Sequence, residues 1–597
     1  MMRTVIYLLV LTVFTATYAC ADAEFYLSAR ADGKDGAGTA VDPFNAGSQQ
    51  QFDTLFAGFG PNTVIHLGPG TYHTQGKARF SVQAGWKIRG AGYEVTRIVQ
   101  DRTGKIGCTV FAGRADGVEI EDLSVDCGFQ NQQLVNGKIK ANASAIGIGG
   151  SHIAVRRCLF KNYGSPYDQD TGENFAVFIG SPDPANGENL VVEDCIFAGM
   201  SPLLAGGQSV LTIAGGPPAN NLTAGNWARG TIARRNYFTG YHYGCHGITM
   251  SGSQGGVIED NVFEHFMGAC VYQDTWPMRD IVVQNNIMSD VNQGIRLAGD
   301  WLDMNDFQIR NNIILVNDGY DLKSIVNGVA TTAIPHSLVV GNRIRFHQLH
   351  VTSGTGFASD SATVTSVPDR TSFTYSLTPG GKSDSMDNAT GGFVQALDYQ
   401  GCMCPAPEAL VVFTGGGKEP HPPTNFIIER NIIKPYSSDD TCRVPSSGIS
   451  VCGLRRSQIV DNMVADSGNH ADLVVTSPKG FTSTIVCRDN YHPDGTPLLP
   501  RDGKREIIPS GLLDLPLDAG KGITLTPANG RVRIDLDINA HGVGANRMSR
   551  QVDATGPAHD HLFPGKPGDY AMQGDNLYLY MGDGTAHLWK RLLMGDY

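Results

Sequence analysis

The stretch VIEDNVFEHFMGACVYQDTWPMRDIVVQNNIM (residues 257–288) contains one short pattern twice, and this repeat decides the fold. Alternating apolar residues lead into Asn261, and the same arrangement recurs at Asn286, 25 residues later. Asn236 precedes Asn261 by 25 residues, and Asn312 follows Asn286 by 26. A period of this length is typical of a solenoid, in which each repeat buries its apolar face against its neighbours.

The same pattern extends in both directions from these four asparagines. Its further positions are Leu123, Cys158, Cys195, Asn431, Asn462 and Asn490. The segments before these positions alternate with strand period and contain many β-branched residues, and no helical pattern separates them. Asn side chains stacked at a turn can hydrogen-bond from one coil to the next. We therefore predict an all-β fold, a right-handed parallel β-helix, with Asn261 and Asn286 inside adjacent coils.

The repeat also divides the chain into domains. Its period breaks between Asn312 and Asn431, where 119 residues replace one coil, and we interpret the extra residues as a small β module inserted in a loop. After Asn490 the coils stop, and a terminal module is expected to cover the open end of the solenoid or attach it to a surface. The predicted domains are a signal peptide (1–21), the first part of the β-helix (22–330), the inserted β module (331–397), the last coils (398–505), a β extension or linker (506–548) and a C-terminal β module (549–597).

The first 21 residues have the pattern of a secretory signal peptide. Arg3 precedes an apolar run over residues 5–14, and Ala19 and Ala21 form an A-x-A cleavage site. Cys20 leaves a lipoprotein as the alternative, although the residues before it make a poor lipid-attachment box. The net charge of −12, without a basic tract, argues against nucleic acid or an anionic membrane as partner. We expect a secreted, cell-surface or periplasmic protein without a membrane span.

The cysteines leave two interpretations open. Cys158 and Cys195 hold the same position in consecutive coils, and stacking would place their Cα atoms about 4.8 Å apart. A disulfide accepts that separation, whereas two small buried thiols stacked in the solenoid are the alternative. Of the 12 cysteines, Cys20 is removed with the signal peptide, so an odd number remains and at least one lacks an intrachain partner.

The N-terminal coils, with Thr63 to Tyr72 and Trp86 to Gly92, resemble together with the repeats the pectin-lyase-like superfamily of bacterial β-helix proteins. The resemblance covers residues 22–330 and 400–505. It implies the fold and an exported protein of undefined activity, because this scaffold hosts lyases, hydrolases, epimerases, tailspikes and adhesins.

Stacked strands of a β-helix form a shallow trough of outward residues, and sugar-acting members of the superfamily place their sites there. Aligning the coils on the repeat sets side by side residues 247–251, 269–273 and 294–298. Thr249 and Arg296 then face outward. The middle strand has two registers, and the one that buries fewer polar groups turns Tyr272 and Asp274 outward.

This register assembles a candidate site. The candidate catalytic residues are His246, Tyr272, Asp274, Arg296 and Asp300, and the candidate substrate-binding residues are Thr249, Trp276 and Trp301. An Asp beside an Arg or a His can do acid–base chemistry, and tryptophan faces can carry sugar rings. The two aspartates could instead bind Ca²⁺, the one cofactor that these residue types suggest, or flank a glycosidic bond. An ordinary solvated trough with a surface Arg–Asp pair is the alternative.

One local match is sharper. The segment Gly244–Ser253 (GCHGITMSGS) resembles the histidine segment of polygalacturonases, and Gly294–Leu297 (GIRL) resembles their arginine segment. However, Ala298 replaces the expected lysine, Ser209–Ile213 stands where paired aspartates are expected, and a whole coil separates the two matches. Without those carboxylates the inverting hydrolase mechanism has neither acid nor base. A standard polygalacturonase is therefore not expected.

Two functions of different classes fit these observations. The first is an exported β-helix protein that acts on or binds polysaccharide, with acidic glycans as the class if Arg296 is a ligand. If it is an enzyme, we expect a polysaccharide lyase or a glycoside hydrolase, and a lyase would need a base and a cation, for which His246, Tyr272 and Arg296 are suitable types. The second is a non-enzymatic surface or appendage protein that uses the β-helix as a rigid spacer. The sequence does not set the oligomeric state.

Overall fold

The protein is described by a computed structural model. The described residues are 22–101, 108–129, 143–164, 175–180, 187–199, 209–215, 227–243, 246–273, 278–298, 304–317, 319–333, 336, 338–347, 349–353, 361–369, 371–377, 388–396, 408–413, 423–436, 447–465, 471–476, 484–501, 523–528, 531–536, 570–573, 576–580 and 589–592. The predicted signal peptide lies outside these residues.

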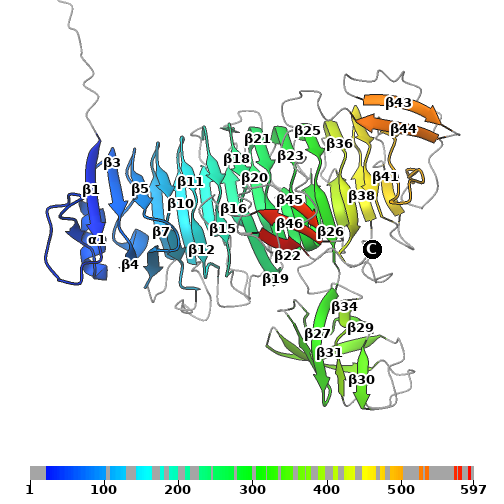
Figure 1. Ribbon diagram of the computed structural model, residues 1–597, viewed down its shortest axis with the longest axis horizontal. Helices are drawn as coiled ribbons and strands as arrows, with labels where there is room; N and C mark the ends of the chain where they lie inside the picture. The colour runs from blue at the N-terminus through cyan, green and yellow to red at the C-terminus, as the bar shows by residue number, and fades with distance from the viewer. Residues whose placement is uncertain are drawn as a thin grey trace, which may run out of the picture.

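Most of the chain forms a right-handed parallel β-helix, as predicted, whose coils stack along the long axis of the molecule (Figure 1). One long parallel sheet, sheet 1, lies on one side of the coils. Its strands are β1 (Ala23–Ser28), β2 (Phe44–Asn45), β3 (Thr63–Leu67), β5 (Lys87–Gly90), β8 (Glu119–Glu121), β11 (Ala154–Arg156), β14 (Val191–Glu193), β17 (Ala228–Arg229), β18 (Ile232–Arg234), β21 (Ser253–Glu259), β23 (Met278–Gln284), β25 (Met304–Arg310), β36 (Thr424–Glu429), β39 (Ser457–Val460) and β42 (Ile485–Arg488).

A second parallel sheet, sheet 2, completes the coils. Its strands are β4 (Gly70–Thr74), β6 (Thr96–Gln100), β7 (Cys108–Arg114), β9 (Ser124–Asp126), β10 (Ala143–Gly149), β12 (Leu159–Lys161), β13 (Val177–Gly180), β15 (Ile196–Phe197), β16 (Ser209–Ala214), β19 (Tyr237–Tyr243), β20 (His246–Ser251), β22 (Val262–Gln273), β24 (Ile287–Ala298), β26 (Ile313–Val316), β35 (Glu408–Phe413), β37 (Ile432–Pro435), β38 (Ser447–Cys452), β40 (Met463–Val464) and β41 (Ala471–Thr476).

Sheet 2 consists of two parallel strips. The proximal strip directly follows the repeat positions and contains β9, β12, β15, β19, β26, β37 and β40. The distal strip contains β7, β10, β13, β16, β20, β35, β38 and β41. Strands β22 and β24 run through both strips, with a register shift where they pass from one to the other. Each complete coil therefore has three sides.

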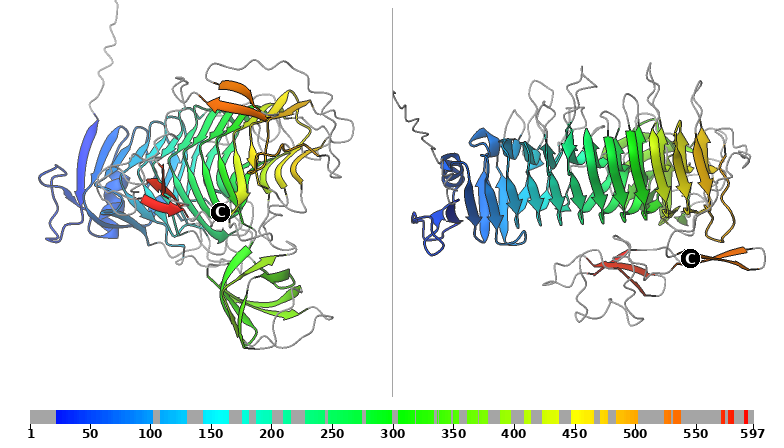
Figure 2. Two further views of the ribbon diagram at one scale, coloured as in Figure 1. Left: turned by 45° about the vertical axis from the view of Figure 1, so that its right-hand side comes forward. Right: turned by 90° about the horizontal axis from the view of Figure 1, so that it is seen from above.

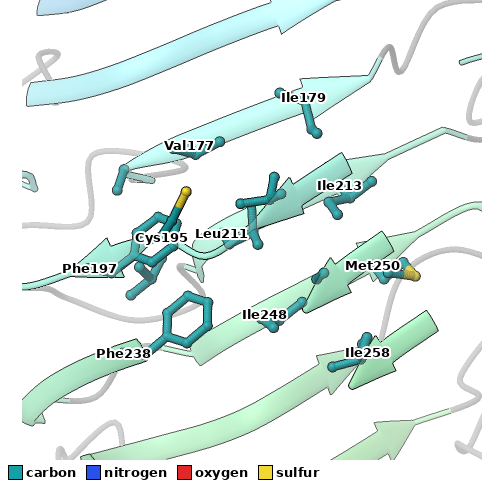
Figure 3. Packing of buried hydrophobic residues seen from close by; sticks show 14 of the residues in the cluster. Val177, Ile179, Cys195, Phe197, Leu211, Ile213, Phe238, Ile248, Met250 and Ile258 are labelled. Atoms are coloured by element: carbon teal, nitrogen blue, oxygen red, sulfur yellow. The ribbon is translucent and has the colours of Figure 1, made fainter. Parts of the chain in front are cut away.

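The core is a set of ladders running along the solenoid axis. On successive strands of the distal strip, buried aliphatic side chains such as Leu211 and Ile248 stack in register (Figure 3). In the proximal strip, the rings of Phe197, Phe238 and Phe263 stack with centroids 4.6 and 4.8 Å apart. Each fully buried side chain of this size contributes about 1.5–3 kcal/mol. The core grows with the number of coils, which is how a chain of this length stays in one solenoid.

The asparagine ladder lies inside the coils, which confirms the prediction for Asn261 and Asn286. The backbone N–H and the side-chain amide of Asn261 both donate to Oδ1 of Asn286, at 3.1 and 3.0 Å. The residue before each asparagine is left-handed, with φ of 56° at both Asp260 and Asn285, and this conformation turns the chain from sheet 1 into the proximal strip. Cys195 extends the ladder, because its backbone N–H donates to the next asparagine at 3.0 Å.

Cys158 and Cys195 keep their thiols inside the coils. The thiol of Cys158 donates to the carbonyl of Arg156, and that of Cys195 donates to the carbonyl of Glu193. Burial and the neighbouring Cys158 raise the pKa of Cys195 well above its usual value. Of the two interpretations from the sequence, the structure has the stacked thiols.

A second ladder, of alternating charge, follows the outer face of sheet 1. Its members, in register, are Arg89, Glu121, Arg156, Glu193, Arg234, Glu259, Gln284, Arg310 and Glu429. Glu193 lies between Arg156 and Arg234, with N–O distances of 2.8 and 2.6 Å. Although burial alone would raise the pKa of Glu193, the hydrogen bonds from these arginines lower it to about 2. Opposite charges therefore lie side by side on neighbouring coils, which favours the stacking of these coils.

A short helix and a turn of 3-10 helix accompany the N-terminal coils. Helix α1 (Gln49–Gly58) begins with a capping box between Ser48 and Gln51 and buries Phe52 and Phe56. The 3-10 helix η1 spans Gly76–Ala78. Among the described residues, no helix has both the length and the apolar character needed to cross a membrane.

The insert forms a separate antiparallel sheet with its own core, and it projects from the side of the solenoid (Figure 2). Its strands are β27 (Gly319–Val326), β28 (Val329–Thr332), β29 (Arg343–His347), β30 (His350–Ser353), β31 (Ala362–Asp369), β32 (Ser372–Leu377), β33 (Asn388–Thr390) and β34 (Phe393–Ala396). Among the described strands, β27 pairs only within this sheet, so the antiparallel module already begins at Gly319, ahead of the sequence boundary at residue 331. The alternating sequence of residues 319–326 fits a strand of the coils and a strand of the insert equally well. Only its pairing shows which of the two it is.

Five short strands follow the last coil in the sequence. They form a two-stranded and a three-stranded antiparallel sheet: β43 (Ile523–Ala528), β44 (Arg531–Leu536), β45 (Tyr570–Gln573), β46 (Asn576–Tyr580) and β47 (Trp589–Leu592). A C-terminal β module was predicted as part of the fold class, and the role predicted for it stays a prediction.

Candidate functional site

The outward positions of the distal strip form one continuous row, which we call the distal row. Its members, in register, are Ala112, Gly147, Phe178, Thr212, Thr249, Tyr272, Arg296, Val411, Ser450 and Val474. Tyr272 pairs with Thr249 on one side and with Arg296 on the other, and all three side chains are partly exposed. Their neighbours Ile248, Val271 and Ile295 are buried in the core. The middle strand thus has the register that turns Tyr272 outward.

His246 lies against this row but has little contact with solvent. Its ring stacks flat on that of Tyr272, with centroids 3.6 Å apart and planes inclined by 4°. Its Nδ1 accepts a hydrogen bond from the backbone N–H of Ala269 at 3.1 Å. Because Nδ1 must keep its lone pair for this bond, the ring proton of neutral His246 sits on Nε2. With 9% of its surface exposed, His246 is placed to support Tyr272 and to donate, and it has no lone pair to act as a base.

The other described candidate, Thr249, is joined to the preceding coil. Its hydroxyl forms a hydrogen bond with the hydroxyl of Ser209. Ser209 opens the segment that stands where polygalacturonases would have their paired aspartates. Hydroxyl groups thus occupy this part of the trough, and they supply hydrogen bonds without charge.

The glycines of the two polygalacturonase-like segments have a packing role. A Cβ atom at Gly247 would lie 2.6 Å from the ring of Phe263, and one at Gly294 would lie 2.7 Å from Ile314. Both glycines open the distal strip, where the backbone passes closely over the core of the proximal strip. This part of the sequence match is therefore explained by packing.

Four of the predicted site residues lie outside the described part of the chain: Asp274, Trp276, Asp300 and Trp301. The acid–base pair with Arg296 and the Ca²⁺ site stay predictions for that reason. Within the described ranges, no three His, Cys, Asp or Glu side chains gather as a metal-binding group. The structure therefore brings together Thr249, Tyr272, Arg296 and His246.

Sequence reasoning missed a second group of polar residues, where β22 and β24 bend from the proximal into the distal strip. His265 and Asp290 hold equivalent left-handed positions in adjacent coils, with φ of 62° and 56°. Nδ1 of His265 lies 2.5 Å from Oδ2 of Asp290, and the side-chain amide of Asn317 donates to the other carboxylate oxygen. Each of His265 and Asp290 follows its repeat asparagine by four residues, so the repeat itself contained the signal.

The geometry of this group gives His265 the character of a base. Asp290 is buried, with 5% of its surface exposed, whereas the side chain of His265 is 32% exposed. When the carboxylate of Asp290 accepts a hydrogen bond from Nδ1–H of neutral His265, the lone pair of the ring is on Nε2. The side-chain amide of Asn317 donates to the same carboxylate and holds Asp290 in place. His246 and His265 thus have opposite tautomers in their neutral forms.

The outer face of the proximal strip beside His265 is polar and largely covered. Its outward row contains Thr239, Glu264, Ser289, Leu315 and Lys434 in register. The hydroxyl of Tyr237 donates to Glu264 at 2.5 Å. Burial lowers the pKa of Lys434. The bend therefore lies next to a second set of titratable side chains.

No family model matches the sequence, and no curated protein matches it. Among solved structures, the chain is similar to a GH136 lacto-N-biosidase from Eubacterium ramulus, with 11% identity, a TM-score of 0.40 and coverage of 79% of this chain and 68% of that one. It is similar to a tailspike protein of E. coli bacteriophage HK620 solved with a pentasaccharide (11% identity, TM-score 0.45, coverage 80% and 67%). It is also similar to the A-module of a mannuronan C-5 epimerase from Azotobacter vinelandii (12% identity, TM-score 0.35, coverage 78% and 98%). The fold assignment stands on the strand registers of the chain itself.

Proposed function

We propose that this protein is exported and binds or processes polysaccharide through the distal row at Thr249, Tyr272 and Arg296. The observation that carries the proposal is the in-register placement of an aromatic ring and a guanidinium on adjacent strands, about 4.8 Å apart. An aromatic face offers apolar stacking to a sugar ring, and a guanidinium offers paired donors to a carboxylate. This pair suits a uronate-containing glycan.

His246 supports the proposal by fixing the ring of Tyr272. A flat stack at 3.6 Å between centroids restrains the tyrosine ring from behind, and the hydrogen bond from Ala269 restrains His246 in turn. A ligand that stacks on a preorganised ring loses less conformational entropy on binding. The arrangement thus favours binding at Tyr272 over a merely solvated trough.

The experiment is affinity electrophoresis of the wild-type protein in gels containing alginate, polygalacturonate, xylan or laminarin. We expect retardation in the acidic gels, a loss of affinity of about tenfold or more in Arg296→Ala, and little change in thermal stability. Arg488→Ala, which removes an exposed arginine from sheet 1, is the control. Equal retardation of the Arg296→Ala variant and the wild type would contradict the proposal.

Turnover is measured on the same polysaccharides. A lyase forms unsaturated products that absorb in the ultraviolet, and a hydrolase forms new reducing ends without that absorbance. We expect one of the two signals to accompany binding if the protein is an enzyme, and the pair of assays separates the two classes.

A rigid spacer is the second candidate function, and the continuous ladders along the solenoid favour it. The buried asparagine ladder and the alternating charge ladder both run through many coils, so the body is stiff along its axis. Under this function the terminal modules make the contacts. Removal of the C-terminal residues 506–597 would then abolish attachment, whereas Arg296→Ala would have no effect.

A further inference from the structure

A second aromatic side chain stands in the distal row, three coils before Tyr272. Phe178 pairs with Thr212, and Thr212 pairs with Thr249. Thr249 pairs in turn with Tyr272. With about 4.8 Å from one coil to the next, Phe178 and Tyr272 are about 14 Å apart along the solenoid axis. The row therefore holds two aromatic rings on one line, with two threonines between them.

The ring of Phe178 belongs to the outer face of the solenoid. Its neighbours in β13, Val177 and Ile179, are both buried in the core (Figure 3), and side chains alternate along a strand. Phe178 itself is partly exposed. Because aliphatic side chains already fill the inward face of the distal strip, packing in the core does not account for an aromatic ring at this outward position.

A neighbouring ring holds Phe178 in place. The centroids of Phe175 and Phe178 are 5.3 Å apart, with planes inclined by 43°. A Cβ atom at Gly147, which pairs with Phe178 in the row, would lie 3.7 Å from the ring of Phe175. Two partly exposed rings thus form one aromatic patch beside a position without a side chain. A ring restrained in this way loses little freedom when a ligand stacks on it, as was argued for Tyr272.

The row is open to solvent over a defined length. Every member from Ala112 to Arg296 is partly exposed. Val411, which pairs with Arg296 on the next coil, has only 5% of its surface exposed. Val411 lies in β35, the strand with which the chain rejoins the solenoid after the insert. The open stretch thus runs along the solenoid axis and ends at the guanidinium of Arg296.

We propose that Phe178 is a second position at which a sugar ring stacks, and that an extended glycan lies along the distal row from Phe178 to Arg296. Between the two rings, Thr212 and Thr249 supply hydroxyl groups, which both donate and accept hydrogen bonds. No charged residue stands in the row between Phe178 and Arg296, so only the sugar at Arg296 needs a carboxylate. A span of about 14 Å exceeds a disaccharide, so the ligand is a chain of several sugars. The inference rests on the proposed function for the site at Tyr272 and Arg296.

The test is competition in the gels described for the proposed function, with alginate or polygalacturonate in the gel and its own disaccharide or hexasaccharide as competitor. For the wild type, the hexasaccharide should compete about tenfold better than the disaccharide, because only the longer chain reaches both rings. Phe178→Leu keeps an apolar side chain but removes the ring, and it should lose most of this length advantage without a change for the disaccharide. Phe178→Tyr keeps the ring and should behave as the wild type.

The length advantage is a ratio within one variant, so a partial loss of folded protein does not alter it. Tyr26→Ala is the control, because it removes a partly exposed ring on sheet 1 that stacks on His66 with centroids 4.4 Å apart. It should keep the full length advantage.

An unchanged length advantage in Phe178→Leu would overturn the second stacking position, and so would an equal loss for both competitors. A loss of binding in Arg296→Ala beside either result would leave the proposed function intact. Conversely, full binding by Arg296→Ala, together with a lost length advantage in Phe178→Leu, would refute the role of Arg296 and support the position at Phe178. A wild type that binds neither polysaccharide would overturn both.

Discussion

The replacement Asn286→Asp tests the asparagine ladder with almost no change in shape. The side-chain amide of Asn286 donates to Oδ1 of Asn312 at 2.9 Å and to the carbonyls of Ile258 and Gln284, both at 3.0 Å. A carboxylate cannot donate, so the three hydrogen bonds made by the two N–H groups of the amide disappear, and a negative charge faces three oxygens. At about 1 kcal/mol for each net hydrogen bond, and more for the buried charge, we expect a loss of roughly 3–5 kcal/mol.

The new carboxyl group also predicts a pH dependence. Burial against oxygens raises its pKa in the folded state above the unfolded value of about 3.9. The folded state then favours the protonated form, so the variant should be least destabilised near pH 4 and lose stability as the pH rises towards 7. Wild type and variant are compared by urea unfolding, followed by circular dichroism, at both pH values.

Asn285→Asp is the matched control, because it adds the same charge one residue earlier on the outside of the coil. Its backbone is left-handed with φ of 56°, and the equivalent residue of the preceding coil is already Asp260, with the same φ. We expect a loss of at most about 1 kcal/mol, from the new carboxylate beside that of Asp260. Equal stability of the two variants at pH 7 would refute the reasoning that the ladder amides are needed as donors.

Further predictions concern the charge ladder, the insert and the two histidines. Glu193→Gln should destabilise the protein by roughly 1–3 kcal/mol at pH 7. Because the folded pKa of this residue, about 2, is lower than its unfolded value, the difference should shrink as the pH falls from about 4.5 to 2, as followed by thermal unfolding. Replacing residues 318–407 by one or two glycines should leave the solenoid folded, because the strands on either side of the insert pair with positions about 7 Å apart on β24. Circular dichroism measures this, and loss of the β signal would contradict the prediction. Diethyl pyrocarbonate, read by peptide mass spectrometry, should modify His265 faster than His246, and equal rates would refute the assigned tautomers.

The fold could be predicted because its signal is local and repeated. The period near 25 residues from Asn236 to Asn312, which ends each time in an asparagine, requires only that the chain close one coil per repeat. The alternating charges of the second ladder were equally visible, as ED and RR pairs ahead of successive repeat positions such as Cys158 and Cys195. The pair His265 and Asp290 also follows from the repeat, because residues at equal distance from the repeat position become neighbours in a stacked coil.

The sequence by itself determined the solenoid, its inward ladders and the outward neighbours Thr249, Tyr272 and Arg296, because parallel stacking converts equal spacing into contact. The tertiary structure alone decided which lone pair each histidine keeps, since that depends on the Ala269 backbone for His246 and on a buried carboxylate for His265. It also decided that β27 belongs to the insert. Hydrogen-bond partners depend on the three-dimensional path of the neighbouring coils. The sequence around a residue does not contain that path.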